Sequence, residues 1–121
     1  MLSAIAQIAI TVANVETALV FYRDSLGIPF LFRAGPDLAF LDAGGVRLML
    51  TTPQGAGVVG HNSILYFKVV DIVAVHAALL ARGVADESAP HRVAKMPDHE
   101  LWIGFVRDPD GNRVGLMEEK R

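Results

Sequence analysis

Cysteine is absent from this chain, and tryptophan occurs once, as Trp102. Without cysteine, disulfide bonds, thiolate metal sites and a cysteine nucleophile are all excluded. The 11 Lys and Arg residues form no basic run, and the net charge of −2 argues against a nucleic acid as partner. The sequence also lacks a nucleophile elbow, a P-loop and a dinucleotide-binding fingerprint, which are strong local signals for catalysis or nucleotide binding.

No apolar run reaches the length of a transmembrane helix. The amino-terminal segment carries no basic stretch, and Gln7 and Asn14 interrupt its apolar residues, so we expect neither a signal peptide nor a membrane partner. Apolar residues make up 52% of the 121 residues, which suits one domain with a modest core and excludes a disordered chain. We therefore expect a soluble, cytoplasmic protein.

Two stretches of the chain look like copies of one unit. Residues 8–14 and 65–71 are strand-like segments, each followed by an apolar helical pattern. Farther along, segments 45–50 and 111–116 both begin with glycine and carry Arg47 or Arg113 two places later. A duplicated unit normally builds one concave site between its halves, so residues at equivalent strand positions are the most informative about function.

The first copy predicts a strand over residues 5–12, a helix from 15 to about 26, and strands over 29–34, 38–42 and 46–51. Asn14 is a suitable N-cap for the helix and Gly27 a suitable stop. A glycine-rich segment over residues 52–60 follows without periodicity and is predicted to be a linker.

The second copy predicts a helix capped by Asp71 and ended by Gly83, with Val73, Val75, Ala78 and Leu79 as its apolar positions. It then predicts a weak strand over 91–94, a strong strand over 101–107, a sharp turn at 108–112 and a strand over 113–118, with a longer loop around 90–99.

The sequence therefore predicts one α+β domain over residues 1–121, made of module 1–54 and module 61–121 joined by a glycine-rich linker. Each module is βαβββ. We expect their strands to form a curved mixed sheet around a concave pocket, with the helices on the convex side.

Two motifs resemble those of a known superfamily. Residues 21–27, at the predicted end of the first helix, and residues 107–112, at the last turn, are similar to the vicinal oxygen chelate group. That group includes glyoxalase I, extradiol dioxygenases, fosfomycin-resistance proteins and bleomycin-resistance proteins. The resemblance spans nearly the whole chain and implies the fold and a two-fold homodimer, but not one reaction, because this scaffold hosts unrelated chemistries.

The resemblance also implies which positions would hold a divalent metal in an enzyme of this group. Those positions are Gln7 and Met49 in the first module and Ile64 and Gly115 in the second. Only Gln7 offers an oxygen donor, and a neutral amide is a weak one. Because divalent cations need several carboxylate oxygens or imidazole nitrogens, we expect no metal and no other cofactor.

Strand alternation predicts the composition of the concave face. If Ile8, Ile10, Leu65 and Phe67 pack under the helices, the intervening residues face the pocket. These form an apolar floor with a few polar groups, which is typical of a small-molecule site or of ordinary core packing. Met49 and Met117 would adapt to a ligand, and Gly115 would leave space. The candidate ligand-binding residues are Gln7, Ala9, Thr11, Arg47, Met49, Thr51, Ile64, Tyr66, Trp102, Arg113, Gly115 and Met117.

Several of these residues have alternative interpretations. Arg47 and Arg113 could clamp a carboxylate or phosphate, or they could be solvated and paired with Asp42 and Asp110. The alternation does not determine whether Trp102 lines the pocket or the helix-side core.

The remaining polar candidates show no metal-binding spacing. His61, His91, His99 and Glu100 are either surface groups or rim groups supplied by a mobile loop over 90–99, and His76 is expected on a helix surface. No catalytic residue can be named.

Three functions fit this sequence. The favoured hypothesis is a metal-free protein that binds a small amphipathic or aromatic molecule without changing it, as bleomycin-resistance proteins do. The second is a lyase or dioxygenase with an unusual metal site or general acid–base chemistry. The third is an interaction module whose concave face is filled by its own side chains.

Overall fold

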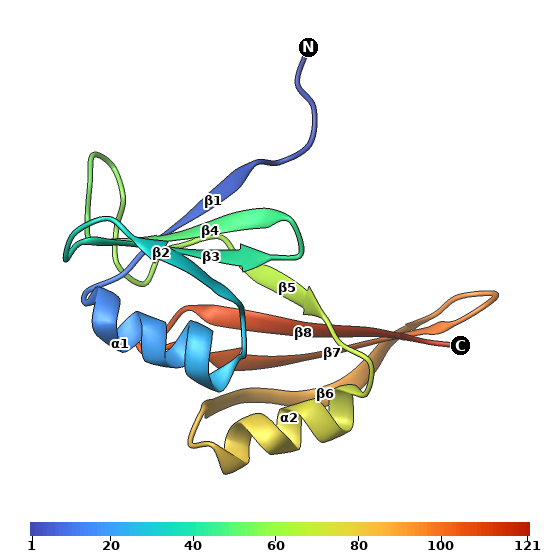
Figure 1. Cartoon of the computed structure of the whole chain (residues 1–121). Coiled ribbons are helices and arrows are strands. Elements are labelled where there is room, and N and C mark those ends of the chain that lie inside the picture. Colours follow the sequence, from blue (N-terminus) through green and yellow to red (C-terminus); the bar gives the residue numbers. More distant parts are fainter. The chain divides into compact units, whose positions relative to one another are not determined.

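The computed structural model describes residues 1–121 and divides them into two compact units, Met1–Asn62 and Ser63–Arg121. Each unit consists of one four-stranded mixed sheet with a helix against one face (Figure 1). None of the helices combines the length and the apolar character needed to cross a membrane.

The first unit has the predicted βαβββ order. Its elements are β1 Gln7–Thr11, α1 Val15–Leu19, η1 Val20–Ser25, β2 Phe30–Arg33, β3 Leu38–Ala43 and β4 Val46–Thr51. The strand order is β1-β4-β3-β2, with β1 parallel to β4 and the other pairs antiparallel.

The second unit repeats this arrangement. Its elements are β5 Leu65–Lys68, α2 Ile72–Ala81, β6 Ala85–Lys95, β7 Glu100–Arg107 and β8 Arg113–Lys120. The strand order is β5-β8-β7-β6, with β5 parallel to β8. The predicted α+β fold of two βαβββ modules is therefore confirmed, as two four-stranded mixed sheets.

The helix ends form as the sequence predicts. The side chain of Asn14 accepts a hydrogen bond from the Thr17 amide at 2.9 Å, and that of Asp71 accepts one from the Ala74 amide at 3.2 Å. The helices stop before Gly27 and Gly83, whose φ angles of 77° and 88° lie in the left-handed region that favours glycine.

The first helix differs from expectation in its second half, because η1 is a π-helix. The Leu26 amide donates to the Phe21 carbonyl at 2.9 Å, which is the i to i+5 bond of this wider turn. The wider turn reduces the angle between successive side chains, and the neighbouring Phe21 and Tyr22 are both buried, edge to face at 4.8 Å between ring centroids. Burial of two adjacent aromatic rings gives this turn its stabilisation.

The core lies between each sheet and its helix. In β4, Leu48 and Leu50 are 1% and 0% exposed, whereas Arg47, which precedes them, is exposed and Met49, which lies between them, is half-buried. In the second unit Val106, Val114 and Leu116 are buried on the equivalent face. The alternation predicted from the sequence is therefore correct, and the face packed on the helix is termed here the helix face.

Helix α2 buries a set of residues that shares only Leu79 with the predicted one. Ile72, His76 and Leu79 face its sheet, whereas Val73 is 54% exposed. The prediction that His76 lies on the helix surface is wrong. All positions of this helix except His76 are apolar, so the apolar pattern did not indicate which side faces the core.

The strand predicted over 91–94 is confirmed as part of a longer one, and the predicted loop at 90–99 is largely wrong, because β6 runs continuously through Lys95. Its pairing with β7 shifts register at three places, and the Pro90 backbone lies over Gly104 of β7. Proline is tolerated at irregular positions of an edge strand, and such bulges disrupt the period of two on which sequence-based strand prediction depends.

Candidate functional site

The second face of each sheet carries most of the predicted ligand-binding residues. In the first unit, β1 and β4 pair Gln7 with Arg47, Ala9 with Met49 and Thr11 with Thr51. Paired residues point to the same side of a sheet, so these six side chains share the face that is turned away from α1. We term this side of each sheet the helix-free face. Of these six side chains, Gln7, Ala9, Arg47 and Met49 are exposed or half-buried.

Two phenylalanines complete this face. Phe40 lies opposite Met49, and Phe32 lies opposite Phe40. The two rings stack with centroids 4.6 Å apart, and Phe32 is 44% exposed. The Arg47 guanidinium lies over both rings, 5.7 Å from the Phe40 centroid and 6.0 Å from that of Phe32. This is cation–π geometry, which holds the charge at a fixed place on the sheet.

Arg47 does not pair with Asp42, one of the alternatives that the sequence leaves open. Asp42 lies directly opposite on β3, but its Oδ1 accepts the Gly45 amide at 2.8 Å. No carboxylate lies within 4.0 Å of the Arg47 guanidinium nitrogens. Arg47 is thus a positioned cation without an ion-pair partner.

Gln7 makes only a weak side-chain contact. Its Nε2 lies 3.7 Å from the Met49 sulfur. A thioether is a poor acceptor, so a carbonyl or carboxylate oxygen placed beside Gln7 would compete effectively for this donor. The amide of Gln7 is therefore available to orient a bound molecule.

Thr11 and Thr51 lie at the covered end of the same face. They are 6% and 4% exposed, and the Asn62 side chain makes two hydrogen bonds to the Thr11 backbone, at 3.0 and 3.1 Å. Gly57 approaches so closely that a Cβ there would lie 2.5 Å from the Thr11 hydroxyl. The glycine-rich segment thus packs on its own unit and helps to remove Thr11 from solvent.

In the second unit the Tyr66 side chain covers part of the helix-free face. Tyr66 pairs with Gly115, and a Cβ on Gly115 would lie 2.5 Å from the Tyr66 ring. The expectation that Gly115 leaves space is therefore wrong, because Tyr66 fills it. Tyr66 also packs edge to face on Phe105 at 5.6 Å. Ile64 is 40% exposed just before β5, and Met117 is half-buried on β8.

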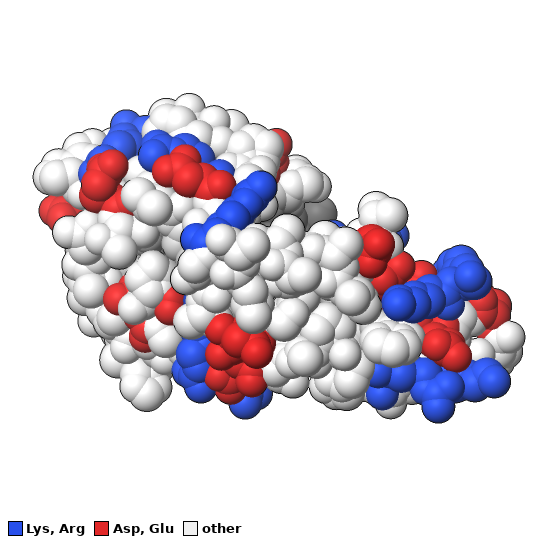
Figure 2. Space-filling model, turned by 90° about the horizontal axis from the view of Figure 1, so that it is seen from below, with Lys and Arg blue, Asp and Glu red and all other residues white.

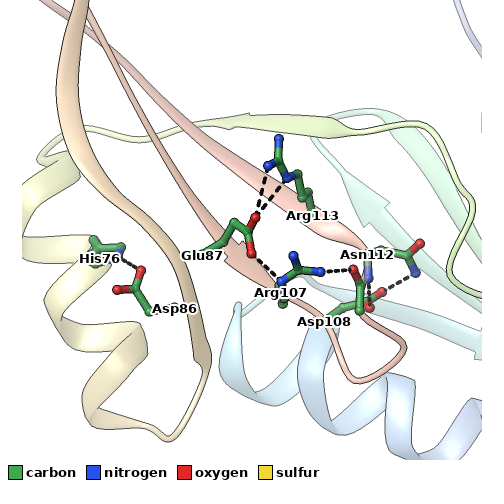
Figure 3. Close-up of polar contacts among 8 residues, drawn as sticks. His76, Asp86, Glu87, Arg107, Asp108, Asn112 and Arg113 are labelled. Carbon is green, nitrogen blue, oxygen red and sulfur yellow. Dashed lines mark hydrogen bonds and ion pairs between the residues drawn. The ribbon is translucent and has the colours of Figure 1, made fainter.

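Arg113, the counterpart of Arg47, also lies over a phenylalanine, 5.4 Å from the Phe105 centroid. Unlike Arg47 it has an acidic partner, because its guanidinium lies 3.1 Å from the Glu87 carboxylate (Figure 3). Arg107 pairs with the same carboxylate. The hydrogen bond from Arg107, and then that from Arg113, hold the pKa of Glu87 below its usual range.

Trp102 lies apart from the other predicted ligand-binding residues. It pairs with Glu118, whose carboxylate accepts the Ile72 amide at the start of α2, so both belong to the helix face. The Trp102 indole donates to Glu100 at 3.1 Å, and the Lys120 ammonium lies 4.2 Å from its ring centroid. The structure thus places Trp102 on the helix face, one of the two alternatives that the sequence did not distinguish.

The histidines do not converge. His76 is buried, with Nε2 2.9 Å from Asp86 (Figure 3). His61 and His91 are exposed. His99 lies 2.7 Å from Asp98 in the turn between β6 and β7. Hydrogen bonds from His99 and then from Arg121 lower the pKa of Asp98 to about 2.

A cavity of about 340 Å³ lies at the end of the β6–β7 hairpin. Its walls include Lys95, Met96, Pro97, His99, Lys120 and Arg121. Figure 2 shows acidic and basic side chains mixed at this end of the hairpin. Arg121 pairs with Asp98 at 2.7 Å and with Glu119 at 3.0 Å. Since the charges there satisfy one another, we assign no ligand to this cavity.

The residues at the four family metal positions do not fit a divalent cation. Gln7 and Met49 offer one amide oxygen and one thioether, Ile64 offers no donor, and the Tyr66 ring covers Gly115. Nowhere in the chain do three or more His, Asp or Glu side chains gather in a metal-binding arrangement.

The turn between β7 and β8 explains one of the motifs that carry the resemblance. The buried Asp108 accepts hydrogen bonds from the amides of Asp110 and Asn112, at 3.0 and 2.8 Å, and from the Asn112 side chain at 2.8 Å (Figure 3). Asp108, Gly111 and Asn112 thus have a structural role in this turn, which sets the entry of β8 and with it the position of Arg113.

With this geometry established, comparison with known proteins identifies the family. Residues 4–116 match the Glyoxalase/Bleomycin resistance protein/Dioxygenase superfamily. The chain belongs to this superfamily. A curated relative, described as the uncharacterized protein YraH of Bacillus subtilis (strain 168), is 28% identical over 93% of this chain and 95% of its own length.

Solved structures agree with this assignment. A lactoylglutathione lyase from Agrobacterium tumefaciens is 26% identical, with a TM-score of 0.79 over 98% of this chain and 95% of its own. A superfamily member from Sphaerobacter thermophilus is also 26% identical, with a TM-score of 0.79 over 98% of this chain and 99% of its own. These likenesses establish the superfamily without selecting a reaction.

Sequence reasoning missed Phe32, Phe40, Phe105 and Glu87. The phenylalanines could have been found by extending the strand alternation from β4 and β8 to their antiparallel neighbours. Glu87 carried no signal, because it lies in an irregular part of β6 for which the sequence predicts no strand.

Proposed function

We propose that this protein binds a small amphipathic or aromatic molecule in the cytoplasm, without a metal and without chemical change. The helix-free face of the first unit supplies apolar and aromatic surface through Met49 and Phe32, and polar groups through Gln7 and Arg47. The helix-free face of the second unit supplies aromatic surface through Tyr66. This is the usual composition of a small-molecule site.

One observation carries the proposal. Of the four positions where an enzyme of this superfamily would hold its metal, three are occupied by Met49, Ile64 and Gly115, which lies under the Tyr66 ring, and the fourth is Gln7. Side chains of this kind favour contact with the apolar part of a ligand over coordination of a metal ion. The lyase activity in the name of the Agrobacterium relative is therefore not the function proposed for this chain.

The test uses N-phenyl-1-naphthylamine, a neutral aromatic fluorophore, with protein purified with and without chelator. We expect saturable binding in both preparations, and far less than one equivalent of divalent metal by elemental analysis. Ile64→Asp is expected to weaken the binding while leaving the melting temperature nearly unchanged, because Ile64 is 40% exposed. Binding that requires stoichiometric metal would favour the enzyme hypothesis, and absence of any binding would favour the interaction module.

We also propose a two-fold symmetric homodimer with two equivalent pockets. In this superfamily the modules commonly complete their sites with those of a partner chain, and closed two-fold symmetry is the commonest arrangement of soluble oligomers. Sedimentation at roughly tens of micromolar, a concentration well above typical specific affinities, should show a dimer. A monomer at that concentration would contradict this part of the proposal.

A further inference from the structure

We infer that the ligand is an anionic aromatic molecule and that Arg47 binds its acidic group, with Gln7 as second donor. This inference rests on the proposed function and gives it a ligand class: an aromatic body bearing a carboxylate, sulfonate or phosphate. It comes from a difference between two equivalent arginines of the same chain.

Arg47 is held in place without being neutralised. Contact with the Phe32 and Phe40 rings fixes its guanidinium 5.7 to 6.0 Å from their centroids, but a ring carries no net charge to offset it. The directly opposite Asp42 is engaged by the Gly45 amide instead. A guanidinium restrained in this way loses less side-chain entropy when it binds a planar anion.

A second donor lies next to it. Gln7 is the register partner of Arg47 across the parallel pair β1 and β4, so both side chains rise from neighbouring points on one face. The Gln7 amide currently donates only to the Met49 thioether, at 3.7 Å. An anionic oxygen is a far better acceptor than this sulfur, and the bond to it would be charge-assisted.

The aromatic preference comes from the surface around these donors. Phe32 is 44% exposed beside the guanidinium, and Met49 is half-buried between Gln7 and the Phe40 ring. A flat apolar body can stack on Phe32 or pack on Met49 while its acidic group reaches Arg47. A purely polar anion would leave this apolar surface in water.

Arg113 provides the internal contrast. It occupies the equivalent strand position and lies over Phe105, yet Glu87 neutralises it at 3.1 Å, and Arg107 shares that carboxylate. An added anion there would have to compete with an existing ion pair. The first helix-free face therefore carries a cation without an acidic partner, whereas the cation of the second is already paired. Only the first face is expected to select an acidic ligand.

The experiment compares two fluorophores with one ring system, the anionic 8-anilinonaphthalene-1-sulfonate and the neutral N-phenyl-1-naphthylamine. In the folded, full-length protein, Arg47→Gln should weaken sulfonate binding about tenfold or more, the size of one lost charge-assisted contact. Binding of the neutral probe should change by less than about twofold, since Gln preserves most of the apolar stem. Raising the salt concentration should weaken sulfonate binding to the wild type only.

Arg113→Gln is the matched control and should leave the affinities for both probes unchanged. Arg47→Lys should recover part of the sulfonate affinity, because it restores the charge without the bidentate fork. Circular dichroism and melting temperature verify the fold of each variant.

The outcomes separate the two proposals. If neither probe binds the wild type, the proposed function fails, and this inference fails with it. If the neutral probe binds but Arg47→Gln affects both probes equally, or neither, the function stands and the inference is overturned. An equal loss of sulfonate affinity in Arg113→Gln would also overturn it.

Discussion

The two units of this protein share a fold but differ on their helix-free faces. Both place an arginine over a phenylalanine at equivalent strand positions, as Arg47 over Phe40 and Arg113 over Phe105. In the first unit the cation has no acidic partner, whereas in the second it is held by Glu87. The duplicated unit thus keeps the residues that pack its helix while its other face is free to specialise.

The largest expected effect is on stability, and it tests the buried helix face that both units have. Leu48 and Val114 lie on equivalent helix faces and are 1% and 2% exposed. Leu48→Asp and Val114→Asp should each unfold the protein, since an unpaired carboxylate in the core costs several kcal/mol, roughly 3 to 5. Urea denaturation followed by circular dichroism measures this loss.

The control for that comparison is Met49→Asp, one residue away on the helix-free face, where Met49 is half-buried. It should fold, with a loss of no more than about 1 kcal/mol, because the new carboxylate can remain hydrated. Equal destabilisation by Leu48→Asp and Met49→Asp would mean that both faces are packed core.

The next effect distinguishes the two hairpin turns. Asp108 is buried and accepts at least three hydrogen bonds, whereas its counterpart Asp42 accepts one, from Gly45 at 2.8 Å. Asp108→Ala should cost about 2 to 3 kcal/mol, because it leaves buried amide donors unpaired. Asp42→Ala should cost about 0.5 to 1 kcal/mol. If thermal melts give the two variants the same loss, Asp108 does not organise its turn as described.

A smaller effect is expected where Tyr66 covers Gly115. Gly115→Ala would place a Cβ 2.5 Å from the Tyr66 ring. Tyr66 is 46% exposed and can swing outward, so the loss should be only about 1 kcal/mol. In a Tyr66→Ala background the same substitution should be neutral or stabilising, since the overlap is gone and alanine suits a strand better than glycine. A double-mutant cycle measures this coupling, and its absence would show that the ring does not rest on Gly115.

The smallest effect concerns pH and the ion pair that only the second unit has. Because the pKa of Glu87 is lowered in the folded state, its stabilisation is present above the unfolded value of about 4.5 and is lost as the pH falls through the folded pKa. Glu87→Gln should therefore lower the melting temperature slightly at neutral pH and make its decrease below pH 4.5 shallower. If the melting temperatures of variant and wild type fall in parallel below pH 4.5, the ion pair does not contribute to stability as described.

The sequence predicted the units well because their signals are local. Helix caps at Asn14 and Asp71, left-handed glycines and alternating strands depend on neighbouring residues, and all of them formed. The errors arose where tertiary contacts override the pattern. Pro90 sits in a bulged strand rather than a loop, and the Asp86 partner of His76 became visible only after β6 was placed.

The candidate site was only partly predictable for the same reason. Alternation correctly grouped Gln7, Ala9, Arg47 and Met49 on one face. It could not assign Trp102, which lies in a strand of almost continuously apolar residues. It also gave no indication that Tyr66 would fold over Gly115 or that Glu87 would neutralise Arg113, because both contacts depend on side chains from other strands.

The central claim is that the helix-free faces bind an aromatic ligand, and methyl NMR tests it most directly. Protein labelled at Ala, Met and Leu methyl groups would be titrated with N-phenyl-1-naphthylamine in the presence of chelator. The account predicts saturable shifts at Ala9, Met49 and Met117, with little change at the helix-face residues Leu48, Leu50 and Leu116. Shifts concentrated on the helix-face leucines, or no shift at any methyl group up to the solubility limit of the probe, would contradict it.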